Sequence, residues 1–331
     1  PAAGAGTVGR WYASISAWEA GRNADITASG RNAIERGLPY YDGAADTTFV
    51  TIDGWTTDAT HYIEIYVPLS ERHRGKWDTG KYRLEITGQA VNVHSAFVRI
   101  QGLQILITPS VNNTDAIEYY GANDNGVGIF SHNIIKVSLD GTDNDMAGIR
   151  MSWAGTTNTR TAKIFNNIIY NFVNPGQTNL SGMVFSSDTT GFVYNNTIQN
   201  SYNGIVINSG SSVTAKNNIT QGCANGFLES GGGVFAAASN YNISDLASDA
   251  PSLSYRSGLA TTVPFVATST QDFHLDFRDG TGNLAMNAGT SAVSEIGFDT
   301  DIDGDTRSGV WDIGADDAGA TLVMTHSIGT A

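Results

Sequence analysis

The chain has 331 residues, and its 32 acidic against 18 basic side chains give a net charge of −14. This charge argues against broad binding to nucleic-acid phosphates or to an anionic lipid surface, which both need clustered Lys and Arg, and no run approaches the ~20 apolar residues of a membrane span. Only 15% of the residues are charged, where about 25% is typical, and 38 are Gly, so the composition favours many strands joined by tight turns.

The N-terminal part predicts a cap and two early strands. Ile15 and Trp18 lie on one side of a short helix predicted within residues 12–21. Residues 49–53 and 62–67 alternate apolar and polar side chains, which is typical of strands. We expect the helix to cover the open end of whatever stack the later residues form, because an exposed strand edge invites aggregation.

A basic run with one aromatic residue follows at residues 71–77. Such a run could contact nucleic acid or an acidic glycan. The acidic character of the whole chain favours a second interpretation, in which the run is the solvated tip of a loop.

The middle of the chain is repetitive. A glycine followed by alternating apolar residues recurs at Gly126, Gly148, Gly182, Gly204 and Gly226. Three of the four intervals are equal, and the interval from Gly148 to Gly182 is longer by an insertion. A unit of about 22 residues is too short for a strand–helix–strand crossover, but it fits two or three short strands with turns.

A second repeat contains paired asparagines, as in Asn166-Asn167, Asn195-Asn196 and Asn217-Asn218. We predict that Asn166, Asn195 and Asn217 stack as an inward ladder whose amides bind one another and the carbonyls of a tight bend. Asparagine also tolerates the left-handed backbone that such bends need. A role in glycosylation or sugar binding is the alternative, and the repeat register favours the structural role.

Both repeats indicate coils that stack ~4.8 Å apart along one axis. Equivalent residues then stand above one another, and one set of apolar positions fills the interior. These predicted inward residues are Ile149, Met183, Ile205, Phe227, Met151, Phe185 and Ile207.

This pattern resembles the right-handed parallel β-helix, or pectate-lyase-like, superfamily, over roughly residues 90–245. Residues 97–105 resemble an opening strand pair, and the segments 272–275, 287–290, 301–307 and 312–315 resemble a closing segment. The resemblance implies one continuous all-β domain: a cap and irregular coils in 1–90, regular coils in 91–245, and acidic strands with a closure in 246–331. Its members include polysaccharide lyases and hydrolases, secreted surface proteins, and bacteriophage tailspike and capsid-surface proteins.

The glycine repeat also predicts an outward column, made of Gly128, Arg150, Val184, Val206 and Leu228. It contains no carboxylate, which argues against a catalytic face on this sheet. Val184, Val206 and Leu228 would form an exposed apolar stripe. We expect a subunit contact of a homo-oligomer, for example a trimer, to cover this stripe. A lid formed by the insertion loop is the alternative.

If the protein is an enzyme, the acids in the loops before the glycines are the best candidates. Asp124, Asp143 and Asp145 could converge near Arg150 on adjacent coils. Glycoside hydrolysis needs two carboxyls about 5–9.5 Å apart. The next three loops carry no acid, so solvated turn residues are the alternative interpretation, and no catalytic residue is favoured.

One acidic cluster resembles half of a calcium loop: Asp299, Asp301, Asp303 and Asp305, with Gly304 among them. Val310 stands where an EF-hand has its bidentate Glu, so other ligands would have to complete a Ca²⁺ site. A purely structural turn is the alternative, and no cofactor is required.

Three functions stay open. The first is a non-enzymatic structural or adhesive protein on a bacteriophage virion surface, such as a capsid decoration, head fibre or tail component. Such a protein would be made in the host cytoplasm, would contact other virion proteins and could bind a cell-surface glycan. The second is a polysaccharide lyase or glycoside hydrolase of tailspike type. The third is a secreted bacterial adhesion protein at the cell surface, which would need a signal sequence ahead of Pro1. We expect neither nucleic-acid binding nor membrane insertion.

Overall fold

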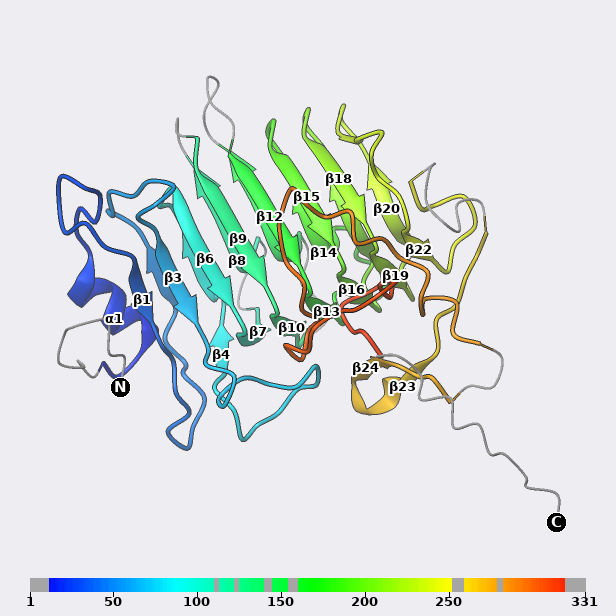
Figure 1. Ribbon diagram of the computed structural model, residues 1–331, viewed down its shortest axis with the longest axis horizontal. Coiled ribbons are helices and arrows are strands. Elements are labelled where there is room, and N and C mark those ends of the chain that lie inside the picture. Colours follow the sequence, from blue (N-terminus) through cyan, green and yellow to red (C-terminus); the bar gives the residue numbers. More distant parts are fainter. Residues whose placement is uncertain are drawn as a thin grey trace, which may run out of the picture.

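The computed structural model describes residues 12–109, 113–121, 125–139, 145–153, 160–251, 259–278 and 282–318. Within these residues the chain winds into a right-handed parallel β-helix of seven coils, each contributing one strand to each of three parallel sheets. Figure 1 shows the coils stacked side by side from the N-terminal helix onward. The predicted fold class is confirmed.

Each coil passes through the sheets in a fixed order, which we number 1, 2 and 3. Sheet 1 contains β2 (Val50–Ile52), β5 (Val91–Val93), β8 (Asp115–Gly121), β11 (Met146–Trp153), β14 (Leu180–Phe185), β17 (Asn203–Ile207) and β20 (Asn225–Glu229). Sheet 2 contains β1 (Glu35–Gly37), β3 (Ile63–Tyr66), β6 (Phe97–Gln101), β9 (Val127–Ser131), β12 (Thr161–Phe165), β15 (Thr190–Tyr194), β18 (Ser212–Lys216) and β21 (Val234–Phe235). Sheet 3 contains β4 (Leu84–Thr87), β7 (Gln104–Thr108), β10 (Ile134–Val137), β13 (Ile168–Tyr170), β16 (Thr197–Gln199), β19 (Ile219–Gln221) and β22 (Ile243–Ser244).

The interior of the stack is apolar, as predicted. Ile149 pairs with Met183, which in turn pairs with Ile205, and the column ends at Phe227. Met151, Phe185 and Ile207 form the next inward column of the same sheet and are fully buried. The stack begins with β1, which pairs with β3, and β2 and β3 pair in register with β5 and β6, so coils already form before residue 91.

The repeated glycines mark a close approach of sheet 1 to sheet 3. A Cβ at Gly182 would lie 2.7 Å from a methyl group of Ile198, and Gly148 and Gly204 have equivalent neighbours. Only glycine therefore fits at this point of the coil.

Gly126 does not belong to this glycine repeat, and here the predicted alignment is wrong. The segment after it forms β9 of sheet 2, which pairs with β6 and β12. The strand of sheet 1 next to β11 is instead β8. The equal interval between Gly126 and Gly148 is a coincidence, because the coils at this end carry longer loops.

The asparagine ladder exists, but one residue later than predicted. Its inward members are Asn133, Asn167, Asn196, Asn218 and Asn242. Each of the last four accepts bonds from the backbone N–H and the side-chain amide of the preceding member, and Asn133 accepts the backbone N–H of Leu103.

Asn166, Asn195 and Asn217 instead adopt the left-handed backbone, with φ of 52°, 51° and 55°. Their side chains face outward, where they bind the C-terminal segment. The amide of Asn195, for example, donates to the carbonyls of Asp312 and Gly314.

The predicted N-terminal helix is present as α1 (Ile15–Arg22), capped by the hydroxyl of Ser14. Ile15 and Trp18 are buried, and Trp18 lies against Trp55 with their ring centroids 6.1 Å apart. The basic run 71–77 is not a solvated loop tip. Arg72 and His73 are buried, because the loop folds back onto the stack.

The C-terminal residues 259–278 and 282–318, which we call the strap, run back along the outside of sheet 3. Figure 1 shows the strap in orange and red beside β13, β16 and β19. It contains the hairpin of β23 (Phe265–Ala267) and β24 (Asp272–Leu275), joined by the short 3₁₀ helix η1 (Thr268–Thr270). The strap is therefore a lateral cover rather than a plug at the end of the stack, and it buries the outward apolar residues of sheet 3.

Candidate functional site

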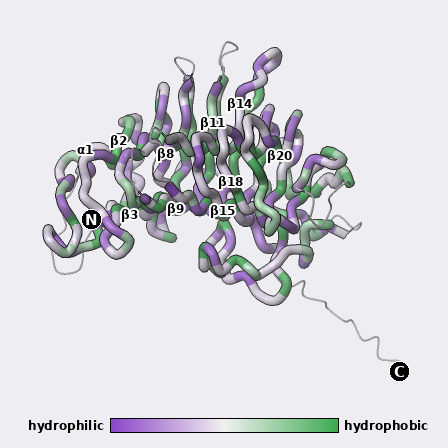
Figure 2. The backbone as a smooth tube through the Cα atoms, turned by 90° about the horizontal axis from the view of Figure 1, so that it is seen from above, coloured by the Kyte–Doolittle hydropathy of each residue, from purple (hydrophilic) through white to green (hydrophobic). Residues whose placement is uncertain are grey.

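The outward side of sheet 1 is the strongest candidate for a functional face. Figure 2 shows β2, β8, β11, β14 and β20 along one side of the stack, opposite β3, β9 and β15. The register sets a row of outward side chains across successive coils: Asn92, Glu118, Arg150, Val184, Val206 and Leu228. The row is polar over its first three coils and apolar over its last three.

Arg150 is the centre of the polar half. Its Nε donates to Oδ2 of Asp115 at 2.8 Å, and its Nη2 donates to Oδ1 of Asp145 at 3.0 Å. Both carboxylates raise the pKa of Arg150 above its ordinary value, although burial opposes them. Arg150 therefore stays positively charged and cannot act as a base.

Asp115 holds Arg150 in place. Burial raises the pKa of Asp115 to about 6, while the charge of Arg150 opposes the rise. Oδ1 of Asp115 accepts the backbone N–H of Ala147 at 2.7 Å, so both of its oxygens are engaged. Asp115 is thus a positioning residue beneath the face rather than a group that meets a ligand.

Glu118 is the half-buried carboxylate beside Arg150 in the outward row. Its two oxygens accept one bond each, from the hydroxyl of Ser152 at 2.9 Å and from the amide of Gln89 at 2.8 Å. Both partners are neutral, so no cation is bonded to Glu118 in these two contacts.

An aromatic pair borders this charged group. The rings of His94 and Tyr120 lie 5.4 Å apart on adjacent coils of the same face. Buried Arg160 ties the two coils together, because its Nη1 donates to the carbonyl of Tyr120 and its Nη2 to that of His94. We name the group of Glu118, Arg150, Asp145, His94 and Tyr120 the sheet 1 site.

The structure brings two of the four predicted catalytic candidates into contact. Arg150 and Asp145 form an ion pair, whereas Asp124 and Asp143 lie outside the described residues. Asp115 and Glu118 were missed, because aligning Gly128 with Arg150 put the wrong strand in the neighbouring coil. The conclusion that this face has no carboxylate was therefore wrong. Aligning Asp115-Ala-Ile-Glu-Tyr with Ala147-Gly-Ile-Arg-Met would have revealed them.

The predicted interface residues lie in the apolar half of the row. Val184 and Val206 are only 5% and 7% exposed within a single chain, and Leu228 is half-buried. The side chains of Ala147, Val184 and Val206 pack together, with Leu228 against them. The apolar surface left for a subunit contact is thus mainly Leu228, and the contact itself stays a prediction.

The predicted calcium residues do not form one group. Asp299 and Asp305 are exposed, whereas Asp301 is buried. Oδ1 of Asp301 accepts the N–H groups of Asp303 and Asp305, which closes the turn. This arrangement fits the structural interpretation, and Ca²⁺ binding by these four residues stays a prediction.

Comparisons of the chain with protein-family models, with curated proteins and with solved structures find no match. In the described part of the chain, no helix is long and apolar enough to cross a membrane. The resemblance to β-helix proteins is therefore confirmed for the architecture alone.

Proposed function

We propose that the protein binds a polysaccharide across the coils of sheet 1, with the sheet 1 site as its centre. The observation that carries this proposal is the pairing of Glu118 with Arg150 on neighbouring strands, beside the rings of His94 and Tyr120. Sugar hydroxyls donate to carboxylates and accept from guanidinium groups, and the apolar faces of sugar rings pack on aromatic side chains.

The regular stack suits a repeating ligand. Adjacent coils present equivalent side chains ~4.8 Å apart on a rigid scaffold, so a glycan chain can contact several coils without ordering a loop. Binding to a preformed surface avoids the entropic cost of ordering that surface. The acidic character of the whole chain favours a neutral or cationic glycan over a strongly anionic one.

Hydrolysis of the bound glycan is a second candidate function. It is favoured by two carboxylates with surface access near Arg150. Glu118 is its register partner on the neighbouring strand, and Asp145, whose side chain is 48% exposed, forms an ion pair with it. A lyase reaction with Arg150 as the base is disfavoured, because its ion pairs hold the guanidinium in the protonated form.

We propose the surface of a bacteriophage virion as the setting, with the protein as a head-fibre, decoration or tail component, and the exterior of a bacterial cell as the alternative. A rigid, charge-poor solenoid suits both. In either setting the protein would be a homo-oligomer, and the virion setting adds contacts with other virion proteins.

The test is a screen of the full chain against a panel of bacterial surface polysaccharides and neutral plant and algal glycans, for binding and for release of oligosaccharides. Glu118→Gln should weaken binding at least tenfold. Glu85→Gln is the matched control, because Glu85 is a half-exposed carboxylate on the outward face of sheet 3.

Equal loss in both variants, or none in either, would show that sheet 1 is not the binding face. Cleavage that is abolished by Glu118→Gln but not by Glu85→Gln would favour the hydrolase. If no glycan of the panel binds, the proposal fails and the purely structural role takes its place.

A further inference from the structure

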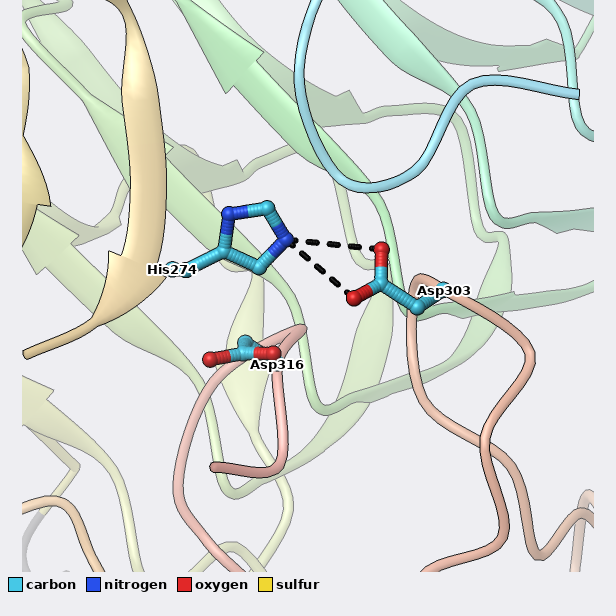
Figure 3. Close-up of side chains that lie close together, drawn as sticks. All are labelled: His274, Asp303 and Asp316. Carbon is cyan, nitrogen blue, oxygen red and sulfur yellow. Dashed lines mark hydrogen bonds and ion pairs between the residues drawn. The ribbon is translucent and has the colours of Figure 1, made fainter. Parts of the chain in front are cut away.

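A second cluster of functional side chains lies in the strap, away from sheet 1. One ligand atom each from His274, Asp303 and Asp316 lies within 4.8 Å of the other two. Figure 3 shows the imidazole of His274 directed at the carboxylate of Asp303, with Asp316 beside them. The three residues come from β24, from the turn after residue 300 and from the end of the strap, so the cluster joins three separate segments.

The imidazole is already oriented as in a metal ligand. Nδ1 of His274 lies 2.6 Å from Oδ1 of Asp272, which fixes the ring and directs Nε2 toward the cluster. Nε2 lies 3.2 Å and 3.4 Å from the two oxygens of Asp303. Histidines that bind metals almost always have such a carboxylate or carbonyl partner on the other ring nitrogen.

Negative charge is in excess around this cluster. The carboxylates of Asp272, Asp301, Asp303 and Asp316 act on one another or on His274, and the permanent cations Lys76 and Arg307 oppose them. Burial opposes charging of His274, but the carboxylates of Asp303, Asp316 and Asp272 raise its pKa to about 10, so in the chain alone a proton on the imidazole offsets part of this charge. Such an excess is costly unless a cation compensates it.

A second, independent observation comes from His73 in the loop that covers the cluster. His73 is 1% exposed, its Nε2 is bonded to the carbonyl of His132, and its Nδ1 has no partner. The charges of Asp303 and His274 act on this ring. Gly75 of the same loop lies so close that a Cβ there would be 2.2 Å from Nε2 of His274. A buried imidazole nitrogen without a partner marks a place where a polar ligand belongs.

We propose that His274, Asp303 and Asp316 bind one divalent transition-metal ion of the zinc type, which fastens three segments of the strap to one another. One imidazole nitrogen and two carboxylate oxygens are a donor set that Zn²⁺ accepts, with water as a fourth ligand. Ca²⁺ prefers oxygen ligands alone, so this site differs from the calcium loop predicted from the sequence in both its residues and its metal. His73 lies outside the group of three and is not assigned as a ligand.

The test is a titration of the full chain, stripped with a chelator and dialysed, with ZnCl₂ alone and with CaCl₂ alone. Calorimetry should show one Zn²⁺ per chain and a weaker response to Ca²⁺. Thermal unfolding should shift upward with Zn²⁺, and proteolysis in the strap should slow. Asp303→Asn should weaken Zn²⁺ binding at least tenfold, whereas Asp305→Asn, at an exposed position of the same turn, should leave it unchanged.

A third variant keeps the proposal testable if Asp303→Asn does not fold. Asp272→Asn leaves all three ligands in place but loses the charge that orients His274, and it should weaken Zn²⁺ binding about 10- to 100-fold. The proposal is overturned if the wild-type chain binds no Zn²⁺, if Ca²⁺ binds more tightly, or if the Asp272, Asp303 and Asp305 variants all retain the wild-type affinity.

Discussion

The outward faces of sheets 1 and 3 belong to the same coils, but the strap covers sheet 3 and does not cover sheet 1. In sheet 3 one outward row is mostly apolar, with Ile134, Ile168, Ile219 and Ile243 in line with Thr197, and the strap buries these isoleucines. In sheet 1 the outward row begins with Asn92, Glu118 and Arg150, and the strap lies on the other side of the stack. The two faces share the same backbone architecture. The strap covers the face whose outward row is mostly apolar, whereas the face whose outward row begins with polar residues is left open to a ligand.

The largest expected effect comes from detaching the cover of sheet 3. Arg307 is buried, and its Nη2 donates to the carbonyls of Gly314 and Ala315 and to Oδ1 of Asn166 in the bend. Arg307→Met removes these three bonds, and it also removes the buried cation that faces the carboxylates of Asp301 and Asp317. It should therefore lower the free energy of unfolding by about 3 to 5 kcal/mol. Urea unfolding measures the change.

Arg278→Met is the matched control, because Arg278 lies on the same strap with a side chain that is 63% exposed. A loss of less than about 0.5 kcal/mol is expected there. Similar losses in both variants would mean that Arg307 does not fasten the strap.

The next effect separates the inner asparagine ladder from the outer asparagines that hold the strap. Asn196→Ala removes the acceptor of the backbone N–H and side-chain amide of Asn167, and it removes the amide that donates to the carbonyls of Ile164 and Tyr194. A loss of about 3 kcal/mol in the free energy of unfolding is expected. Asn195→Gly keeps the left-handed backbone and removes only the side-chain bonds, at about 1 to 2 kcal/mol. A larger loss for Asn195→Gly in urea unfolding would contradict the inward position of Asn196.

The open face should also make its own contribution to the pH dependence of stability. The folded pKa of Asp115 is about 6, above an unfolded value of ~3.9. The contribution of Asp115 to the free energy of unfolding is therefore fully present below pH ~4 and is lost as the pH rises through 6. The difference in unfolding free energy between the wild type and Asp115→Asn should fall by about 2 to 3 kcal/mol from pH 4 to pH 7.

Urea unfolding of both proteins at several pH values measures this difference. Comparing the two proteins removes the contributions of Asp301 and Asp316, which are also raised, and of His73 and His132, which are lowered. Parallel profiles, or a difference that grows with pH, would show that Asp115 is not a buried carboxyl beneath the open face.

The smallest effect on the single chain is expected at the end of the outward row. Leu228→Lys should change the unfolding free energy by less than about 0.5 kcal/mol, because Leu228 is only half-buried. The same substitution should dissociate a homo-oligomer built on this stripe, which sedimentation velocity would detect. A wild-type monomer, or an oligomer that the variant leaves intact, would refute the subunit contact.

Much of the fold could be predicted from the sequence, because the same short sequence pattern recurs in successive coils of a solenoid. The inward columns through Ile149 and Met151 follow from alternation and a constant interval, and both are correct. The bends that contain asparagine were also predicted, but the sequence analysis placed Asn195 inside the stack where the structure has Asn196. Both amides are buried, one inside the stack and one beneath the strap, and only the position of the strap distinguishes them.

The candidate site was harder to predict because its partners come from coils of unequal length. Glu118 and Arg150 are separated by one whole long coil in the sequence and are adjacent in the structure. A constant repeat length pairs Arg150 with Gly128 instead. Loop insertions change the repeat length in the coils that carry these charged residues. The pairing of residues between neighbouring strands could therefore be assigned only from the structure.

The most direct test of the open face is carboxyl labelling with a carbodiimide and an amine, with and without a polysaccharide that binds. Mass spectrometry then reports the modification of each acidic side chain. We predict that the glycan protects Glu118 and Asp145 and leaves Glu85 of sheet 3 as reactive as before. Protection of Glu85, with Glu118 and Asp145 unchanged, would place the ligand elsewhere and contradict the assignment of sheet 1 as the functional face.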